Sequence, residues 1–583
     1  MKLIPFLIST LPFLGSGSGH LTPIVSDTHH QITYHGLERN NIEVFLGIPY
    51  GQDTGGPARF KPPTKHVPSP GSRVNATAYG PSCPQLGEWA PPLLLANITH
   101  MSEDCLNLNV ARPKGTRAGE RLPVMVFIHG GGLFKGDNHD PTILPDRLVA
   151  ESVENGSPVV HVALNYRLGV FGFARSDALK AEKAENNGLR DQRLALEWVR
   201  DNIAHFGGNP DKITVFGQSS GGLSVSLQLM AYGATKPVPF HQAIAQSQML
   251  EPGIAGNYTL QATQMVADHV GCNTTALSSP ATITCLRNLD TRTLLDASLA
   301  TYSETLHLGE IWLPTVDGDF IPEKPSTLLR TGRFANVTTM IGWCQDDTTV
   351  FTDPAIQTEA DVRAFFGLYV PALSKSNMDK LLSLYPPAEF TSPTPPNPTT
   401  PNILSTQFFR AARIFRDILM TCPPLAYGSH LSAAGNDVYL YNWNQTILSP
   451  ILEQVIPGTA GWGPIHTSEF AYMFGNLERY DTNGFVFEPT GADYNLVKRG
   501  TRSWANFAAT GRPGAVGRET FQGFGKGFQG GGGEEVWVYV VGGKREGLTA
   551  VEGERATEEM RRQRLKERCG FLNGEEVVEQ FEF

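Results

Sequence analysis

The sequence predicts an α/β protein whose core is a large, mostly parallel sheet flanked by helices. Apolar segments of strand length alternate with segments of helical periodicity, which is the pattern of repeated strand–helix–strand units. The strand segments are apolar throughout, as strands covered on both faces are. With 583 residues, 40% of them hydrophobic, the chain can bury a large core, and its 60 Gly and 42 Pro exclude a long coiled coil.

The first half of the chain holds the clearest elements. Strands are expected within Leu122–Gly132, which runs into a glycine turn, and within Ser157–Arg167. A helix is expected over residues 189–206, where apolar residues recur at helical spacing and two glycines follow. Ile213–Phe216 is predicted to be a short β-branched strand, and a second helix can begin just after Ser219.

The second half of the chain has weaker signals. A strand is predicted at Ala243–Ala245, and beyond about residue 355 the pattern becomes helical, with an apolar face over Leu404–Leu419. Pro386–Pro401 and Gly511–Gly533 are loops by composition. Because patterned sequence resumes after each loop, neither is predicted to separate domains, although length alone allows three or four domains of about 150 residues.

The N-terminal segment has the layout of a secretory signal peptide over residues 1–19. Lys2 is followed by the apolar stretch Leu3–Leu14 and then by small residues. A buried N-terminal helix is the alternative, but Pro5 and Pro12 interrupt the stretch and it has no amphipathic period. No other stretch reaches the ~20 apolar residues that a spanning helix requires, so we expect a secreted protein without a transmembrane segment.

Glycosylation motifs agree with export. A triplet at Asn155 is doubtful because Pro158 follows it. The asparagines that begin usable N-x-S/T triplets are Asn75, Asn97, Asn257, Asn273, Asn336 and Asn444.

The segment Gly217-Gln218-Ser219-Ser220-Gly221 is a G-x-S-x-G motif in an informative position. A strand is predicted to end just before it and a helix to begin after Ser219. The serine would therefore lie at a strained strand-to-helix turn that raises its hydroxyl above the sheet edge. A Ser/Gly turn without chemistry is the alternative, and the glycine segment that starts at His129 weighs against it.

A serine hydroxyl is a weak nucleophile, so it needs a base and also donors for the oxyanion that its attack creates. The segment His129-Gly130-Gly131-Gly132 ends an earlier strand, where an oxyanion hole on this type of sheet is built. The candidate donors are the backbone N–H groups of Gly131, Gly132 and Ser220. His129 precedes the serine in the chain, so we interpret it as a positioning residue rather than as the base.

With these motifs the chain resembles the type-B carboxylesterase/lipase family, which includes cholinesterases and fungal extracellular esterases and lipases, and it fits the fungal branch best. The resemblance implies an α/β-hydrolase fold with helical and loop insertions around the active site, formed by a single domain over residues 20–583. The matching stretches, in the family's order, are FLGIPYG (Phe45–Gly51), SEDCLNLNV (Ser102–Val110), HGGG, NYRLGVFGF (Asn165–Phe173), GLRDQRLALEWVRDNI (Gly188–Ile203), FGGNPDKITVFGQSSGG (Phe206–Gly222) and LPTVDGDFIP (Leu313–Pro322).

The resemblance also implies partners for Ser219. The family's Gly-x-x-x-acidic-acidic segment matches residues 342–347 and makes Asp347 the acid that fixes the imidazole tautomer of the base. The base is His466, within the segment 463–469. The order Ser219, Asp347, His466 is the chain order of α/β-hydrolases.

The 7 cysteines should mostly pair in an oxidising compartment, with at least one left over, and spacing alone does not fix the pairing. The family resemblance implies three disulfide bridges. They leave Cys344 unpaired, and we interpret it as a buried, inert thiol. Arg59 with Glu103, and Arg167 with Asp191, match family salt bridges and are interpreted as structural. The bridges implied by the resemblance are Cys83–Cys105, Cys272–Cys285 and Cys422–Cys569.

Three residues depart from the family pattern. Gln218 replaces the Glu that usually precedes the nucleophile, which removes a charge and keeps hydrogen-bonding capacity. Ser220 stands where Ala is common and adds a hydroxyl. Gln248 stands where the family has Gly, and we expect it to narrow or reshape the pocket.

The loop between Cys83 and Cys105 bears on the substrate. Its 21 residues are few for a mobile lid, and Pro91 and Pro92 stiffen it beside the apolar Leu93–Leu95. We therefore expect a serine carboxylic-ester hydrolase that cleaves short to medium acyl or aryl esters through an acyl-enzyme. A lid-gated triacylglycerol lipase is the alternative, and a non-catalytic binding or adhesion homologue is disfavoured by the intact motifs.

Composition limits the partners. With 47 basic and 57 acidic residues the net charge is −10, and no run of five or more Lys/Arg occurs, so nucleic acid is not expected as a partner. The expected partner is a small, neutral ester. No cofactor and no metal are expected, and the sequence leaves the oligomeric state open.

Overall fold

The computed structural model describes residues 22–87, 97–303, 306–390, 404–455, 459, 461–481, 487–529 and 535–583. The predicted signal peptide, the stretch 88–96 of the loop between Cys83 and Cys105, and most of the predicted Pro/Thr-rich loop lie outside these ranges.

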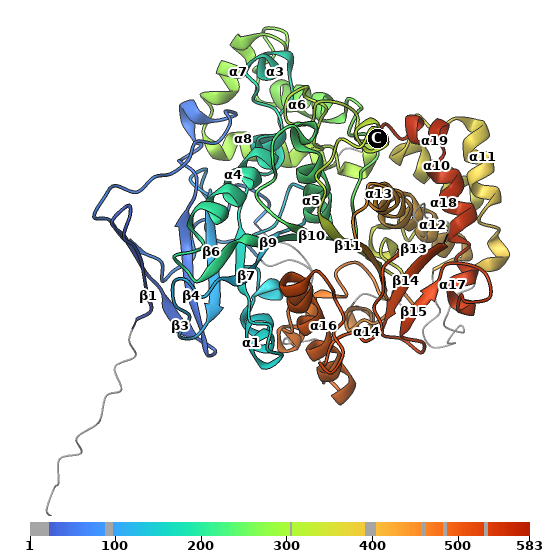
Figure 1. Ribbon diagram of the computed structural model, residues 1–583. Helices are drawn as coiled ribbons and strands as arrows, with labels where there is room; N and C mark the ends of the chain where they lie inside the picture. The colour runs from blue at the N-terminus through green and yellow to red at the C-terminus, as the bar shows by residue number, and fades with distance from the viewer. Residues whose placement is uncertain are drawn as a thin grey trace, which may run out of the picture.

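One large sheet runs through the middle of the molecule (Figure 1). All neighbouring pairs in its central part are parallel, and antiparallel strands lie at both edges, so the predicted α/β class with a mostly parallel sheet is confirmed. Its twelve strands among the described residues are, in spatial order, β13 (Phe528–Gln529), β14 (Glu535–Val541), β12 (Val438–Trp443), β11 (Thr338–Cys344), β10 (Gln242–Gln246), β9 (Gly208–Gln218), β7 (Leu122–Ile128), β8 (Val160–Leu164), β6 (Asn107–Pro113), β4 (Ile42–Pro49) and β3 (Leu37–Arg39), with β15 (Gly547–Ala550) paired to β14.

The apolar character of the central strands explains the layers around them. Every residue of β8, β10 and β12 is buried, so both faces of the sheet need a cover. In Figure 1 helices lie above and below the sheet. Above it are α4 (Asn187–Asn202) and α5 (Ser220–Met230), and below it are α1 (Asp146–Glu154) and α16 (Gly491–Thr510).

The ends of the longest of these helices follow local rules. The Thr490 hydroxyl accepts the N–H of Asp493, and the Asp493 carboxylate accepts the N–H of Thr490, so a capping box begins α16. The helix ends at Gly511, whose φ of 75° is the left-handed conformation that glycine adopts most easily.

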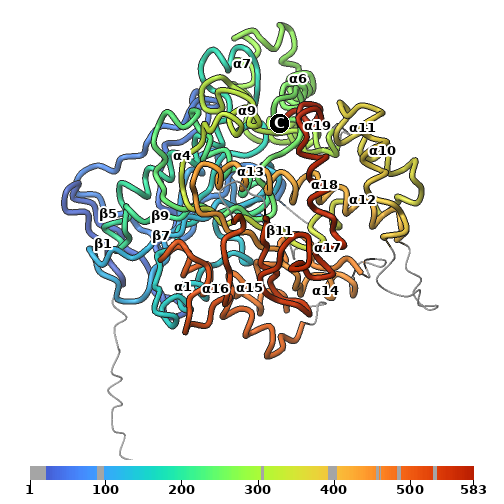
Figure 2. The backbone as a smooth tube through the Cα atoms, turned by 45° about the vertical axis from the view of Figure 1, so that its right-hand side comes forward, coloured from blue at the N-terminus to red at the C-terminus, as the bar shows by residue number. Residues whose placement is uncertain are grey.

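A helical region lies beside the end of the sheet that is formed by the last strands of the chain, β13 to β15. Segments far apart in the sequence lie side by side there in both views (Figures 1 and 2). The disulfide between Cys422 and Cys569 joins two of its helices, α13 and α18. The region contains α10 (Glu359–Tyr369), α11 (Lys375–Ser383), α12 (Thr406–Arg416), α13 (Cys422–Ala433), α17 (Glu558–Arg562), α18 (Leu565–Leu572) and α19 (Glu575–Gln580).

The predictions for the first half of the chain agree with the structure, and one prediction for the second half is wrong. Strands β7, β8, β9 and β10 and helices α4 and α5 all lie where they were expected. Beyond residue 355, however, the chain is not only helical, because β12 and β14 add two parallel strands to the sheet. These segments are short, buried and rich in aromatic residues, and such a run has no periodicity that distinguishes a strand from a buried helix.

The structure contains the three disulfides that the resemblance implied, and Cys344 is unpaired and buried. Both implied salt bridges are present and buried. Arg59 lies 2.5 Å from Glu103, and Arg167 lies 2.7 Å from Asp191. Arg59 also donates to three backbone carbonyl groups, which supports its structural interpretation.

The asparagines of the N-x-S/T triplets differ in exposure, and their glycosylation stays a prediction. Asn155, the doubtful one, is buried, and Asn444 is half-buried and donates to Glu559 at 2.9 Å. None of the helices in the described ranges combines the length and the apolar character needed to cross a bilayer. The exposed asparagines are Asn75, Asn97, Asn257, Asn273 and Asn336.

Candidate active site

The predicted site residues meet at the carboxyl edge of the parallel strands. Ser219 follows β9 directly, Asp347 lies three residues after β11, and His466 lies in the connection that follows β12. Because the carboxyl ends of neighbouring parallel strands share one edge, residues more than 100 positions apart converge there.

Ser219 occupies the strained turn that its motif predicted. Its backbone has φ 59° and ψ −132°, an unfavourable conformation for a residue with a side chain. Helix α5 begins at the next residue and the Ser219 N–H donates to the Gln246 carbonyl at 2.8 Å, so the surroundings hold this conformation. A Cβ at Gly217 would overlap the Gly221 carbonyl, and one at Gly221 would overlap the Ile128 carbonyl, so both flanking positions require glycine.

Asp347 and His466 form a short, buried pair. The His466 Nδ1 lies 2.5 Å from Asp347 Oδ1, and the second carboxylate oxygen of Asp347 accepts the Cys344 N–H at 2.8 Å. A carboxylate only accepts, so the proton of the neutral imidazole lies on Nδ1 and the lone pair on Nε2. That is the tautomer a general base for Ser219 requires.

Gln218 occupies the position where the family usually has Glu, and its amide contacts His466, the predicted base. Its Nε2 lies 3.0 Å from His466 Nε2, so the amide donates to the lone pair that would accept the serine proton. Within the described residues the Ser219 hydroxyl has no hydrogen bond, although Ser219 and His466 line the same cavity. Such catalytic contacts often tighten only when substrate binds.

The glycine turn of the predicted oxyanion hole packs against Ser219, the predicted nucleophile. Gly131 and Gly132 have φ of 102° and 62°, and a Cβ on Gly130 would lie 2.9 Å from the Ser219 Cβ. His129 stacks on Tyr166 with ring centroids 4.4 Å apart, and burial lowers the pKa of His129. These contacts fit the positioning role expected of His129.

Ser220 links the glycine turn to the helix that follows Ser219. Its hydroxyl accepts the N–H of Leu133 at 3.2 Å, so the turn that carries Gly131 and Gly132 is hydrogen-bonded to the start of α5. The hydroxyl that departs from the family pattern therefore has a defined structural partner.

Replacing Ser220 with alanine is expected to lower kcat about 5-fold. The substitution removes one hydrogen bond worth about 1 kcal/mol and leaves the Leu133 N–H unpaired beside the oxyanion turn. Ser226→Ala on the same helix is the matched control, because Ser226 is equally buried and its hydroxyl bonds carbonyl groups away from the turn. Steady-state kinetics with an activated aryl ester compare the variants, and an unchanged kcat in Ser220→Ala would refute the link.

Comparison with known proteins agrees with this geometry. The model of the carboxylesterase family matches residues 31–569. The chain is 49% identical over 564 residues to a secreted lipase of Arthroderma benhamiae, covering 96% of each chain. The chain belongs to the carboxylesterase family. It is therefore a carboxylic-ester hydrolase and, like the Arthroderma lipase, a secreted protein.

Two further relatives of this carboxylesterase family member are informative. An inactive carboxylesterase-like protein of Byssochlamys spectabilis is 36% identical over 501 residues, covering 84% of this chain and 83% of the relative. The crystal structure of Aspergillus niger EstA matches 96% of this chain and 99% of its own with a TM-score of 0.76 at 24% identity. The latter likeness supports the α/β-hydrolase fold.

Two small cavities of the carboxylesterase meet at Ser219, and Gly132, Glu310 and Phe351 line both of them. The first, here called the polar compartment, has about 130 Å³. The second, the aromatic compartment, has about 100 Å³ and contains His466. The polar compartment is defined by Gln248, Glu251, His307, Glu310, Tyr369 and an apolar wall of Leu133, Leu223, Leu308, Leu313, Phe415, Leu419 and Met420; the aromatic compartment is defined by Phe127, Phe134, Ile143, Phe351 and Phe470.

The polar compartment includes residues that the sequence analysis did not identify. Glu251 and Glu310 are acidic residues within otherwise apolar segments, and that local contrast is the signal that could have identified them. Gln248 was expected to reshape the pocket, and it lines the compartment and donates to Glu251.

A second buried carboxylate lies behind the Asp347–His466 pair. The Glu469 carboxylate accepts one hydrogen bond from the Cys344 thiol at 3.1 Å and another from the Gln246 amide at 3.3 Å. Burial, together with the nearby charge of Asp347, raises the pKa of Glu469. Burial also raises the pKa of the Cys344 thiol, which keeps it protonated and fits the inert role expected of it.

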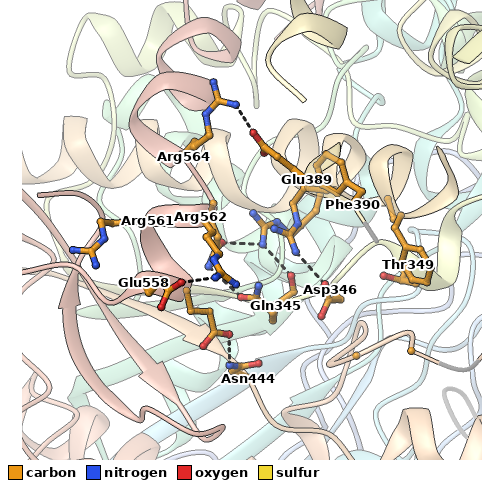
Figure 3. Close-up of a pocket in the computed structure, with 18 of the residues that line it drawn as sticks. Gln345, Asp346, Thr349, Glu389, Phe390, Asn444, Glu558, Arg561, Arg562 and Arg564 are labelled. Carbon is orange, nitrogen blue, oxygen red and sulfur yellow. Dashed lines mark hydrogen bonds and ion pairs between the residues drawn. The ribbon is translucent and has the colours of Figure 1, made fainter. Parts of the chain in front are cut away.

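A much larger cleft of about 1440 Å³, here called the outer cleft, is lined by Gln345, Asp346 and Thr349 from the segment that follows β11 (Figure 3). Arg413 pairs with Asp346 at 3.2 Å, and Arg416 donates to the Gln345 carbonyl at 2.9 Å. Among the described residues that line it, neither Ser219 nor His466 appears, so we do not assign the chemistry to this cleft. Arg413 and Arg416 instead hold the two residues that precede Asp347.

Proposed function

We propose that the protein cleaves short to medium acyl or aryl esters through an acyl-enzyme formed on Ser219. The observation that carries the proposal is the strained Ser219 beside the Asp347–His466 pair and the glycine turn. A reactive serine needs a base of the correct tautomer and preorganised donors for the oxyanion, and these three features supply both.

The reaction would follow two half-cycles. The Ser219 oxygen attacks the ester carbonyl carbon while its proton moves to His466 Nε2, and the N–H groups of Gly131, Gly132 and Ser220 stabilise the oxyanion. The C–O bond to the alcohol then breaks, and the alcohol leaves with the proton from His466. Water repeats the attack on the acyl-enzyme, which releases the acid and restores the serine.

The small volume of the two compartments supports a preference for short esters. Their volumes are about 130 Å³ and about 100 Å³, well below the roughly 300 to 1,000 Å³ of pockets that enclose drug-sized ligands, so each compartment admits only a small substituent. An ester with a long acyl chain would need additional space.

A lid-gated triacylglycerol lipase remains the second candidate, because the relative at 49% identity is named a lipase. The stretch that would decide this, residues 88–96, lies outside the described ranges. A non-catalytic function is the third possibility, because the Byssochlamys relative is named inactive. It is disfavoured here because Ser219 is present and Asp347 and His466 are paired.

The esterase proposal predicts a rate profile. We expect kcat/KM for 4-nitrophenyl esters to be highest for acyl chains of about two to four carbons and to fall as the chain lengthens, because the compartments are small. The measurement compares acetate to palmitate esters below and above the concentration at which the substrate forms droplets. Higher activity on long chains together with a jump at the droplet threshold would contradict the esterase and favour the lipase.

Processing of the chain is proposed in the same way. We propose cleavage of the signal peptide after residue 19 and a single domain over residues 20–583, which the match of the family model to residues 31–569 supports. We also propose that the six asparagines named above carry glycans, and the exposure of five of them supports this.

A further inference from the structure

Glu310 places a carboxyl group beside the nucleophile. It lines both compartments together with Ser219 and Phe351, and its side chain is half-buried. Gly309, with φ 88°, provides the turn that brings it there. Within the described residues the Glu310 carboxyl accepts no hydrogen bond and forms no ion pair. A polar group in such a setting gains from a partner that the substrate could supply.

The second carboxyl group of the polar compartment, Glu251, already has its partners. Its oxygens accept from the Tyr369 hydroxyl at 2.8 Å, from the Gln248 amide, and from His307 Nε2 at 3.1 Å. Its hydrogen bonds are therefore satisfied by the protein, and it has less to offer a substrate than Glu310.

The protonation of His307 can be derived from its contacts. Its Nδ1 lies 2.8 Å from the Tyr369 backbone carbonyl, which can only accept, so Nδ1 carries a proton. Its Nε2 lies 3.1 Å from Glu251, so both ring nitrogens of His307 have partners within the protein.

Burial and several nearby charged groups shift the pKa of the Glu310 carboxyl group. Burial, followed by the charge of Glu251, raises the pKa of Glu310 to about 7, and His307 and His466 oppose that rise. Glu310 thus changes between a neutral acid, which can donate, and a carboxylate, which only accepts. A substrate hydroxyl suits both forms because it can accept and donate, whereas a hydrocarbon chain satisfies neither.

We propose that Glu310 selects esters that carry a hydroxyl group on the substituent that enters the polar compartment. The inference rests on the proposed function and narrows its substrate class from plain short esters to hydroxylated ones. The apolar wall, which includes Leu223, Leu313 and Leu419, accommodates the carbon chain, and Glu310 binds the hydroxyl. An ammonium group is the other donor that the carboxylate could bind, and the test below separates the two.

Matched ester pairs test the selection. One pair, 4-nitrophenyl butyrate and 4-nitrophenyl 3-hydroxybutyrate, places the hydroxyl on the acyl side; the other, propyl acetate and 3-hydroxypropyl acetate, places it on the alcohol side. We expect kcat/KM to favour the hydroxyl ester of one pair by about 10- to 100-fold, the range of a hydrogen bond to a charged group. At pH 8, where Glu310 is mostly a carboxylate that can only accept, the methyl ether of that ester should lose the preference, because it has no donor.

Variants of Glu310 connect the preference to this residue. Glu310→Leu should abolish the preference for the hydroxyl ester, and Glu310→Gln, which is nearly isosteric and keeps a hydrogen-bonding group, should retain part of it. The Gln variant also keeps the test valid if the Leu variant fails to fold. A preference that persists in Glu310→Leu overturns the proposal, as does a wild-type enzyme without preference in either pair or one that prefers 3-aminopropyl acetate.

The pH dependence of the preference gives a second readout. The ratio of kcat/KM for two esters of a pair cancels the titration of the groups common to both reactions. In the wild type this ratio should rise as pH increases from 6 to 8, because a hydroxyl donates more strongly to a carboxylate than it interacts with a neutral acid. In Glu310→Gln the ratio should be flat. Failure of hydrolysis for every ester would instead contradict the proposed function itself.

Discussion

Replacing Ser219 with alanine is expected to lower kcat/KM by at least about 10⁴-fold. The variant keeps the cavities and the glycine turn and loses only the atom that forms the acyl-enzyme. The residual rate would come from binding and oxyanion stabilisation, which act on water as the nucleophile. The measurement is kcat/KM with an activated aryl ester, at enzyme concentrations high enough to detect the residual turnover.

Ser220→Ala is the matched control for this result. The same atom is removed one residue along the chain, and the expected loss is only about 5-fold because one supporting hydrogen bond is affected. A thermal unfolding curve for each variant checks that both are folded. Wild-type turnover in Ser219→Ala would show that another residue carries the reaction.

Replacing Asp347 with asparagine is expected to lower kcat about 10³- to 10⁴-fold. Asparagine can still accept the Cys344 N–H through its carbonyl oxygen, and its NH₂ group then faces His466 Nδ1. Nδ1 would become the acceptor and Nε2 would carry the proton, so the base would have no lone pair toward Ser219. The fold should persist because the side chain has nearly the same volume.

The neighbouring acid provides the control. Asp346 pairs with Arg413 in the outer cleft and does not contact His466, so Asp346→Asn should change kcat by less than about 10-fold. If Asp346→Asn were the damaging substitution and Asp347→Asn the mild one, the assignment of the acid would be reversed.

The sequence predicted the parts of the site that depend on residues adjacent to one another in the chain. The turn at Ser219 follows from a strand, two glycines and a helix within a few residues, and the structure has this arrangement. The pairing of Asp347 with His466 involves residues 119 positions apart, so no local pattern could indicate it, and only the family resemblance did.

Other features could not be predicted because they depend on contacts between distant segments. Glu310 and Tyr369 lie on separate segments, and their shared compartment exists only after α10 packs beside the segment that precedes Glu310. The contact of Gln218 with His466 also joins distant residues, so the sequence indicated only that a charge was missing. Strands β12 and β14 were missed because a short apolar run fits a strand and a buried helix equally well.

The Gln218 contact affects how the base works. In this structure the Gln218 amide occupies the lone pair of His466 Nε2, so that hydrogen bond must break or move when Ser219 transfers its proton. Rotation of the amide would present its carbonyl oxygen to the imidazolium, which is the form of His466 that exists after the transfer. A glutamine can serve both states, whereas a Glu carboxylate at this position could only accept.

The central claim is that Ser219 is the nucleophile, and covalent labelling tests it most directly. The protein is incubated with an organophosphate, digested, and its peptides are analysed by mass spectrometry while residual activity is followed. The account predicts one adduct per chain, on Ser219, that forms in parallel with the loss of activity and forms far more slowly in His466→Ala. An adduct on another residue that accompanies the loss of activity, with Ser219 unmodified, would contradict it.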